Sequence, residues 1–157
     1  MFKLLRHFQY LILFAILLLC VFLYSNIFNN GFLLDDYQYF ITKPTLNDVS
    51  VISLFSQAFK GFYRPFAVGF LKFELFLFGN SNPIGYHLVN LALFCCICWL
   101  FFLILYKLFH NYEIALIASC FYAVHPINSF LVNYKTASAI NVCILCMQIS
   151  TLFLFNP

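Results

Sequence analysis

Charged side chains are scarce in this chain of 157 residues: Asp, Glu, Lys and Arg make up 8% of it, and only five residues are acidic. Soluble domains carry about 25% charged and about 45–50% apolar residues, whereas 64% of this sequence is hydrophobic and its mean hydropathy is +0.95. A soluble globular domain is therefore excluded. The few basic residues form no cluster, so nucleic acid is not an expected partner.

Glycine and proline are also few, with five residues each, and no linker rich in them divides the chain. We therefore expect a single membrane domain over residues 1–157. The seven cysteines all lie in apolar runs, and Cys143-x-x-Cys146 lacks the second pair or polar His cluster of a zinc or redox site. We expect the cysteines to pack as small hydrophobic residues.

Long apolar runs are what the chain does have. A helix crosses the bilayer core with about 20 apolar residues, and several runs approach or exceed that length. The predicted fold class is all-α, a polytopic bundle of about four transmembrane helices, with three or five spans as alternatives. The last run reaches almost to the end of the chain, which indicates a truncated sequence. The predicted spans are 8–28, 84–109, 112–124 and 136–155.

The orientation follows from Lys3 and Arg6, which precede the first run and place the amino terminus in the cytoplasm. Residues 29–82 then form an outer loop, facing the periplasm of a bacterium or the lumen of the endoplasmic reticulum. Polar residues at helical spacing predict an amphipathic helix over 48–60 that lies in the interface plane. Residues 66–78 are apolar but too short to span, and predict a second interfacial helix.

Asp35 and Asp36 are adjacent carboxylates at the point where the first span meets water, a costly place for charge. One of them can act as a general base that takes the proton from an acceptor hydroxyl. Alternatively, one orients the acceptor or holds a divalent cation such as Mg²⁺ or Mn²⁺ through its oxygens. The plain structural alternative is a helix N-cap.

Arg64, within Tyr63-Arg64-Pro65 of the same loop, can grip phosphate oxygens bidentately and so bind a lipid phosphate. The alternative is an arginine that snorkels at a helix start. Lys72 is a weaker second candidate for the phosphate.

His87 and Asn90 share one face of the second span, and His125 follows the third. Such residues usually hydrogen-bond a neighbouring helix, and as metal ligands they lack a partner set. Asn128, Asn133 and Lys135 form a polar outer loop that can close a site, although solvation alone also explains them.

Four motifs stand in order along the chain and together resemble the GT-C superfamily of membrane glycosyltransferases. Within it, they are most similar to the transmembrane and tetratricopeptide-repeat O-mannosyltransferases and their bacterial relatives. The motifs are Phe32-Leu33-Leu34-Asp35-Asp36, Tyr63-Arg64-Pro65, Asn82-Pro83-Ile84-Gly85-Tyr86-His87-Leu88-Val89-Asn90 and Ala123-Val124-His125-Pro126-Ile127.

The resemblance implies transfer of a sugar, with mannose as the candidate, from a polyprenyl-phosphate donor to a protein or lipid hydroxyl. It places the aspartate pair at the catalytic base and Arg64 near the donor phosphate, with Tyr63, His87, Asn90 and His125 in support. The chain departs from the family pattern at three positions, where Glu, Arg and an acidic residue are expected. The alternative is therefore a non-catalytic or degenerate membrane protein of the same fold. The departures are Phe130, Ser138 and Ile140.

Overall fold

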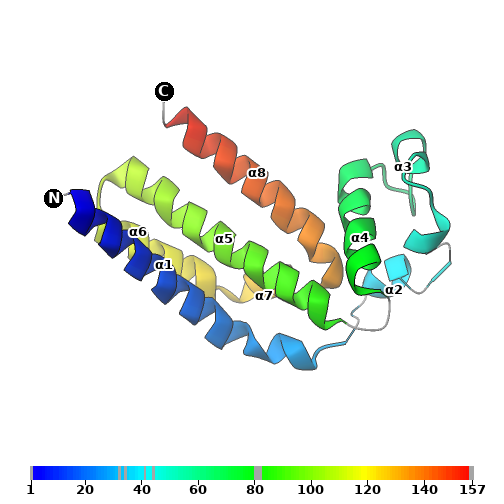
Figure 1. Cartoon of the computed structure of the whole chain (residues 1–157), viewed down its shortest axis with the longest axis horizontal. Coiled ribbons are helices and arrows are strands. Elements are labelled where there is room, and N and C mark those ends of the chain that lie inside the picture. Colours follow the sequence, from blue (N-terminus) through cyan, green and yellow to red (C-terminus); the bar gives the residue numbers. More distant parts are fainter. Residues whose placement is uncertain are drawn as a thin grey trace.

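The computed structural model describes residues 2–31, 33, 35–40, 42–43, 45–79 and 83–155, with the backbone alone at residues 2–10, 13 and 35. Within these ranges the chain is helical apart from short connections and one isolated bridge between Phe59 and Phe62, which confirms the all-α class. Four long helices lie alongside one another (Figure 1). They are α1 (Phe2–Tyr24), α5 (Ile84–Phe109), α6 (Tyr112–Val124) and α8 (Ser138–Leu154).

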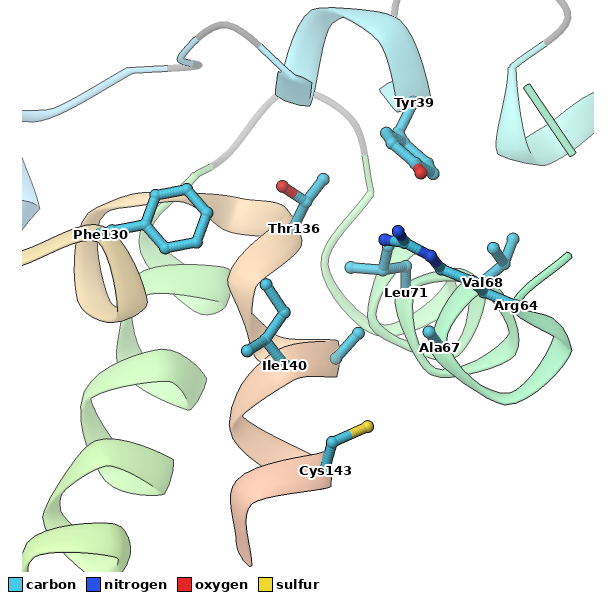
Figure 2. A pocket seen from close by; sticks show the side chains of 10 residues that line it. Tyr39, Arg64, Ala67, Val68, Leu71, Phe130, Thr136, Ile140 and Cys143 are labelled. Atoms are coloured by element: carbon cyan, nitrogen blue, oxygen red, sulfur yellow. The ribbon is translucent and has the colours of Figure 1, made fainter. Parts of the chain in front are cut away.

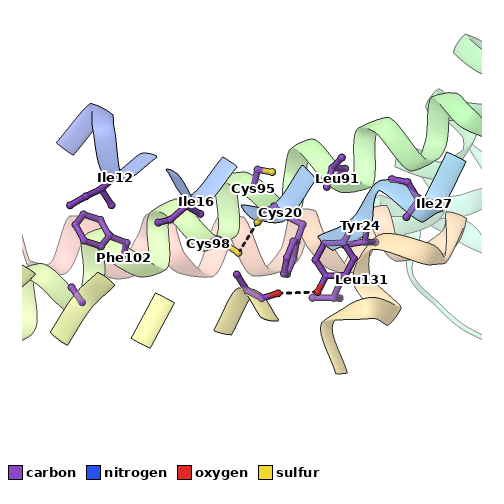
Figure 3. Close-up of a cluster of buried hydrophobic side chains, with 14 residues drawn as sticks. Ile12, Ile16, Cys20, Tyr24, Ile27, Leu91, Cys95, Cys98, Phe102 and Leu131 are labelled. Atoms are coloured by element: carbon purple, nitrogen blue, oxygen red, sulfur yellow. Dashed lines mark hydrogen bonds between the residues drawn. The ribbon is translucent and has the colours of Figure 1, made fainter. Parts of the chain in front are cut away.

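The bundle core forms where α5 packs against α1, α6 and α8. On α1 the buried residues recur every three or four positions, which is the spacing of one helix face. Tyr24 is the last residue of α1, and its hydroxyl donates to the carbonyl of Ala123 on α6 at 3.0 Å (Figure 3). The cysteines are all free, and those in the core pack among apolar side chains. The stripe on α1 consists of Ile12, Ile16, Cys20 and Tyr24, and Ile27 continues it in the 3₁₀ turn that follows.

Two helices, Ile84–Phe109 and Lys135–Leu154, are long and apolar enough to cross a membrane. A third candidate is α6 together with Pro126–Asn133, a pair bent by 57° at His125. Proline cannot continue the hydrogen-bonding pattern of a helix, which accounts for the bend. The polytopic class is thus confirmed, with two to three candidate spans among the residues that were described. The predicted first span, and the orientation drawn from Lys3 and Arg6, stay predictions because those side chains lie outside the described residues.

Short helices gather at the end of the bundle that lies away from the amino terminus (Figure 1). The second predicted interfacial helix is present as α4 (Pro65–Phe78), which starts one residue early because Pro65 suits the first helical turn. It packs against α8. The other short helices before α5 are η1 (Ser25–Asn29), α2 (Asp35–Phe40), η2 (Leu46–Asp48) and α3 (Ser53–Ser56).

The first predicted interfacial helix, over 48–60, is wrong in extent. Only α3, four residues long, is α-helical there. The hydroxyls of Ser53 and Ser56 donate to the carbonyls three residues before them, and Ser50 accepts from the N–H of Ser53. Serine side chains that compete for backbone partners in this way favour turns over helix continuation.

Candidate functional site

Asp36 lies fully buried in the first turn of α2 and joins three segments of the chain. Its carboxylate accepts hydrogen bonds from the backbone N–H groups of Leu33 at 3.1 Å, Lys135 at 3.3 Å and Thr136 at 3.0 Å. Lys135 and Thr136 open η4 (Lys135–Ala137), which leads directly into α8. A carboxylate is stabilised there by unpaired N–H groups and the positive end of the helix dipole. The side chain of Asp35 lies outside the described residues.

Lys135 is also fully buried, rather than part of a solvated outer loop as one sequence interpretation had it. Its ammonium nitrogen lies 4.3 Å from the ring centre of Phe40 and 3.8 Å from that of Tyr86. Aromatic faces attract a cation, and the carboxylates of Asp36 and Glu74 add electrostatic attraction. These attractions offset the cost of burying the Lys135 ammonium, which the sequence interpretation had placed in a solvated loop.

Glu74 comes from α4 and is buried against the start of α8, where the Ser138 hydroxyl donates to its Oε2 at 2.5 Å. Burial raises the pKa of Glu74 to about 7, because desolvation penalises the carboxylate; the Ser138 hydrogen bond and the charge of Lys135 act in the opposite direction. We call Asp36, Glu74, Lys135 and Ser138 the buried charge cluster.

A cavity of about 320 Å³ lies between α4 and the start of α8, and we call it the arginine cavity. Its lining is largely apolar, with Val68 and Leu71 from α4 and Ile140 from α8. Arg64 lines one side and Thr136 the other (Figure 2). The Arg64 guanidinium carbon lies 4.7 Å from the centre of the Phe62 ring. This cavity thus combines a largely apolar lining with the exposed guanidinium group of Arg64.

A second, more open cavity of about 580 Å³ lies between η1 and the segment after α6, and we call it the asparagine cavity. Asn26, Asn29 and Asn30 line it from η1 and the residue that follows, and Asn133 lines it from α7 (Ser129–Asn133). None of its lining residues carries a charge.

The two cavities meet at Phe130, which lines both. Asp36 is tied to each of them, since its carboxylate is held by Leu33 from the asparagine cavity and by Thr136 from the arginine cavity. Asp36 therefore holds one lining residue of each cavity in place through a hydrogen bond.

The remaining predicted residues lie apart from the cavities. Lys72 donates to the carbonyls of Leu46 and Val49, both at 2.6 Å, and lines neither cavity. The exposed Tyr63 donates to the carbonyl of Phe55 at 3.0 Å. His125 is exposed and is the N-cap of η3 (Pro126–Asn128), where its Nδ1 accepts a hydrogen bond from the N–H of Ile127.

His87 and Asn90 are buried on α5 and tie it to the outer segments. The Nε2 of His87 lies 3.1 Å from the carbonyl oxygen of Asn30, and the Asn90 amide donates to the carbonyl of Tyr134 at 2.5 Å. These contacts shape the floor beneath the asparagine cavity, because Asn30 and Tyr134 both line it.

Glu74 and the asparagines of η1 were missed as site residues by the sequence interpretation, which placed Lys135 in an outer loop that can close a site but did not predict its burial. Glu74 carried a usable signal, since an acidic residue within an apolar segment near lipid is costly. Lys135 carried none, because its burial depends on partners that are distant in sequence.

No group of three His, Cys, Asp or Glu side chains within the described ranges is placed to hold a metal ion. Both Asp36 oxygens are already engaged by backbone N–H groups. The described donors therefore do not fit a divalent cation, and the cation expected from the sequence stays a prediction that concerns Asp35.

Comparison with known proteins gives one informative similarity. No family model and no solved structure matches the chain. The chain is 34% identical over 116 residues to the Drosophila melanogaster protein named Protein O-mannosyl-transferase Tmtc1. The match covers 66% of the chain and 13% of that protein, so the chain spans about an eighth of the length of the curated relative it matches. The chain is therefore similar, over most of its own length, to a small part of a protein named as an O-mannosyl-transferase.

Proposed function

We propose that this chain forms the substrate-binding end of a membrane glycosyltransferase that moves a sugar, with mannose as the candidate, from a polyprenyl phosphate to a hydroxyl. The observation that carries the proposal is the pair of cavities that meet at Phe130 and that each include a residue hydrogen-bonded to Asp36. A transferase must hold a donor and an acceptor side by side, next to a group that can take a proton. The similarity to an O-mannosyl-transferase supports the same reaction class.

The donor belongs in the arginine cavity on chemical grounds. A polyprenyl chain is apolar and its phosphate is anionic, and the cavity combines an apolar lining with the Arg64 guanidinium. Arginine pairs with phosphate oxygens through two parallel hydrogen bonds. Lys72 takes no part in this proposal, because its ammonium is engaged by two carbonyls.

The two aspartates take different parts in the proposal. Asp36 is fully buried and holds Leu33, Lys135 and Thr136, so it acts as a positioning residue. The role of general base falls to Asp35, the residue before it at the start of α2. The cavities and α2 face the outer or lumenal side of the membrane in this proposal.

The reaction balances without a further reactant. The acceptor oxygen forms a bond to the anomeric carbon of the sugar, and the bond from that carbon to the phosphate oxygen breaks. Its electron pair leaves with the polyprenyl phosphate, while the hydroxyl proton passes to the Asp35 carboxylate. The products are the glycosylated acceptor and the polyprenyl phosphate.

The test uses the full-length gene product in lipid nanodiscs and a dolichyl-phosphate donor with radiolabelled mannose. Asp35→Asn should reduce transfer to a hydroxyl acceptor by about 100-fold or more, which is within the usual effect of losing a general base. Glu113→Gln, an exposed acid at the start of α6, should leave transfer unchanged. Transfer that survives Asp35→Asn would refute the proposed base, whereas no transfer by the native protein would favour a non-catalytic membrane protein of this fold.

A further inference from the structure

We propose that Glu74 is a positioning residue for the donor, because its contact with Ser138 holds α4 against the start of α8 and sets the width of the arginine cavity in a proton-dependent way. The inference rests on the proposed transferase function, since it concerns the cavity to which that proposal assigns the prenyl phosphate. Neither Glu74 nor Ser138 lines this cavity, so each acts through the helix that carries it.

The contact between Glu74 and Ser138 lies at the edge of the arginine cavity. Glu74 follows Leu71 by three positions, about one helical turn, and Leu71 lines the cavity from α4 (Figure 2). Ser138 precedes Ile140 by two positions, and Ile140 lines the cavity from α8. The Ser138 hydroxyl donates to Oε2 of Glu74 at 2.5 Å and so joins the two walls. A change at this contact therefore shifts α4, with Arg64 at its N-cap, relative to α8.

Two buried carboxylates hold the start of α8, and they differ in how well they are bound. Asp36 accepts three hydrogen bonds from backbone N–H groups. Glu74 accepts one from Ser138, and within the described part of the chain no group bonds to its Oε1, although that atom is buried. An ionised carboxylate has about four lone-pair sites, and leaving them without donors in a buried place costs free energy. Glu74 is therefore the attachment that a change of charge can release.

The apolar surroundings decide which form of Glu74 keeps the helices together. Leu75, next to it on α4, and Ala139, next to Ser138 on α8, belong to one buried apolar cluster. Burial raises the pKa of Glu74 to about 7. Below that pH the neutral acid stays packed between the helices. Above it the carboxylate needs further hydrogen bonds, which water supplies only when α4 moves away from α8.

Lys135, Asp36 and Tyr86 are the charged or titratable groups that lie near Glu74 on neighbouring elements. The Lys135 ammonium of η4 attracts the Glu74 carboxylate, but it is shared with the Asp36 carboxylate of α2. Tyr86 of α5 is a neutral phenol at these pH values. Lys135 therefore offsets only part of the cost of burying an ionised Glu74. Charged groups on the other elements against α4 are engaged elsewhere, namely Lys72 with the carbonyls of Leu46 and Val49, Asp48 with Thr45, and His87 with the carbonyl of Asn30.

The primary test measures binding of a donor analogue as a function of pH. The probe is farnesyl sulfate, which keeps a single negative charge over the whole range, titrated by isothermal calorimetry against the full-length gene product in nanodiscs. The native protein should bind it about 5-fold more weakly at pH 8 than at pH 5.5, as expected if binding raises the pKa of Glu74 by about one unit. Equal affinity at the two pH values, or no binding at either, would overturn the inference.

Substitutions assign the pH dependence to this contact. Glu74→Gln keeps an acceptor for the Ser138 hydroxyl but carries no charge, so its affinity should stay at the native pH 5.5 value throughout. Ser138→Ala removes the donor and should weaken binding by about 3- to 10-fold at pH 5.5. The matched control is Ser150→Ala, which removes a hydroxyl of α8 that bonds the Cys146 carbonyl outside the cavity and should change nothing. A native pH profile in Glu74→Gln would overturn the inference.

The width of the cavity can also be followed in the native protein without a substitution. Cys143 lines the arginine cavity from α8 (Figure 2), whereas Cys146, also exposed, lies outside it on the same helix. Alkylation by N-ethylmaleimide, read by mass spectrometry, gives the ratio of the two rates, which cancels the general rise of thiol reactivity with pH. The ratio of Cys143 to Cys146 should rise between pH 5.5 and pH 8. A constant ratio would overturn the inference, even where Glu74→Gln fails to fold.

The outcomes separate this inference from the proposed function. If farnesyl sulfate binds with the expected pH dependence but no mannose is transferred, Glu74 stands as the positioning residue of a prenyl-anion site and the transferase function fails. If mannose is transferred but the KM for the donor has the same pH profile in the native protein and in Glu74→Gln, the inference is wrong and the transferase function stands. A purely structural role for Glu74 would alter the unfolding temperature and leave the pH profile of binding unchanged, which also overturns the inference.

Discussion

The backbone N–H of Thr136 donates to the carboxylate of Asp36 at 3.0 Å, although the two residues are 100 positions apart in the sequence. Through this bond the start of α2 is fixed to the segment that begins α8. Lys135 donates to the same carboxylate, and Leu33 closes the turn before α2. The aspartate is thus one of the points at which the outer segment and the helical bundle are joined, together with the contact between Glu74 and Ser138.

Removal of this carboxylate should destabilise the protein. Asp36→Ala leaves three backbone N–H groups without their acceptor in a buried place, and we expect a loss of about 3–5 kcal/mol, as for a broken buried charge network. Thermal unfolding in detergent measures it. The matched control is Asp48→Ala, which removes an exposed carboxylate that accepts hydrogen bonds from Thr45 and should lower the unfolding temperature far less. Equal losses in the two variants would contradict the joining role of Asp36.

Glu74 should make stability depend on pH. Its pKa is 4.5 in the unfolded reference and about 7 when folded, because burial penalises the carboxylate. Between these values the folded protein keeps a proton that the unfolded chain has released, so stability falls as the pH rises from about 4.5 to about 7. The full effect is on the order of 3 kcal/mol. The groups that face Glu74 are the Ser138 hydroxyl, Lys135 and Tyr86.

The measurement is apparent unfolding temperature in detergent from pH 4 to pH 8. Glu74→Gln should flatten the profile over this window and exceed the native protein in stability at pH 8. Glu113→Gln, at an exposed helix start, should keep the native profile. A Glu74→Gln profile parallel to the native one would show that Glu74 keeps an ordinary pKa.

The helices were predictable because their signals are local. The run that forms α5 and the apolar segment that forms α4 each carry their length and composition in consecutive residues. The helix predicted over 48–60 failed for an equally local reason, since polar spacing there is supplied by serines that bond the backbone.

The site was predictable only in part. Arg64 and the aspartates could be singled out because charge is rare in this chain. The burial of Lys135 beside Phe40 and Tyr86, and the gathering of asparagines from η1 and α7, depend on contacts between distant segments. No periodicity in the sequence encodes such contacts.

Arg64 and Lys72 are both cations of the outer segment, but only the loss of Arg64 should weaken the binding of a prenyl phosphate. Arg64→Gln should weaken farnesyl phosphate binding by about 10- to 100-fold, the value of a charge-assisted contact of about 1.5–3 kcal/mol. Lys72→Met should leave that affinity within about 2-fold of native. It should instead speed amide hydrogen exchange over residues 46–49, because its two carbonyl contacts hold that segment to α4. A large loss of farnesyl phosphate binding in Lys72→Met would restore Lys72 as a donor ligand.

Gly85 should tolerate no side chain, because α4 and α5 approach closely there. A Cβ at this position would lie 2.3 Å from Cδ1 and 2.5 Å from Cγ of Phe78, whose ring packs on Tyr86. We expect Gly85→Ala to cost about 1–3 kcal/mol, as for an overpacked core, in thermal unfolding. Gly69→Ala is the matched control: it lies within α4 with nothing within 4 Å of its Cβ, so it should stabilise by about 0.5–1 kcal/mol.

The clash itself can be tested with a second substitution. Phe78→Ala removes the ring that a Cβ at Gly85 would meet, so Gly85→Ala should cost much less in the Phe78→Ala background than in the native one. Phe78→Ala alone loses the ring contact with Tyr86 and sets the reference for that comparison. Additive losses in the double variant would mean that the cost of Gly85→Ala arises from the backbone of α5 and not from the contact between α4 and α5.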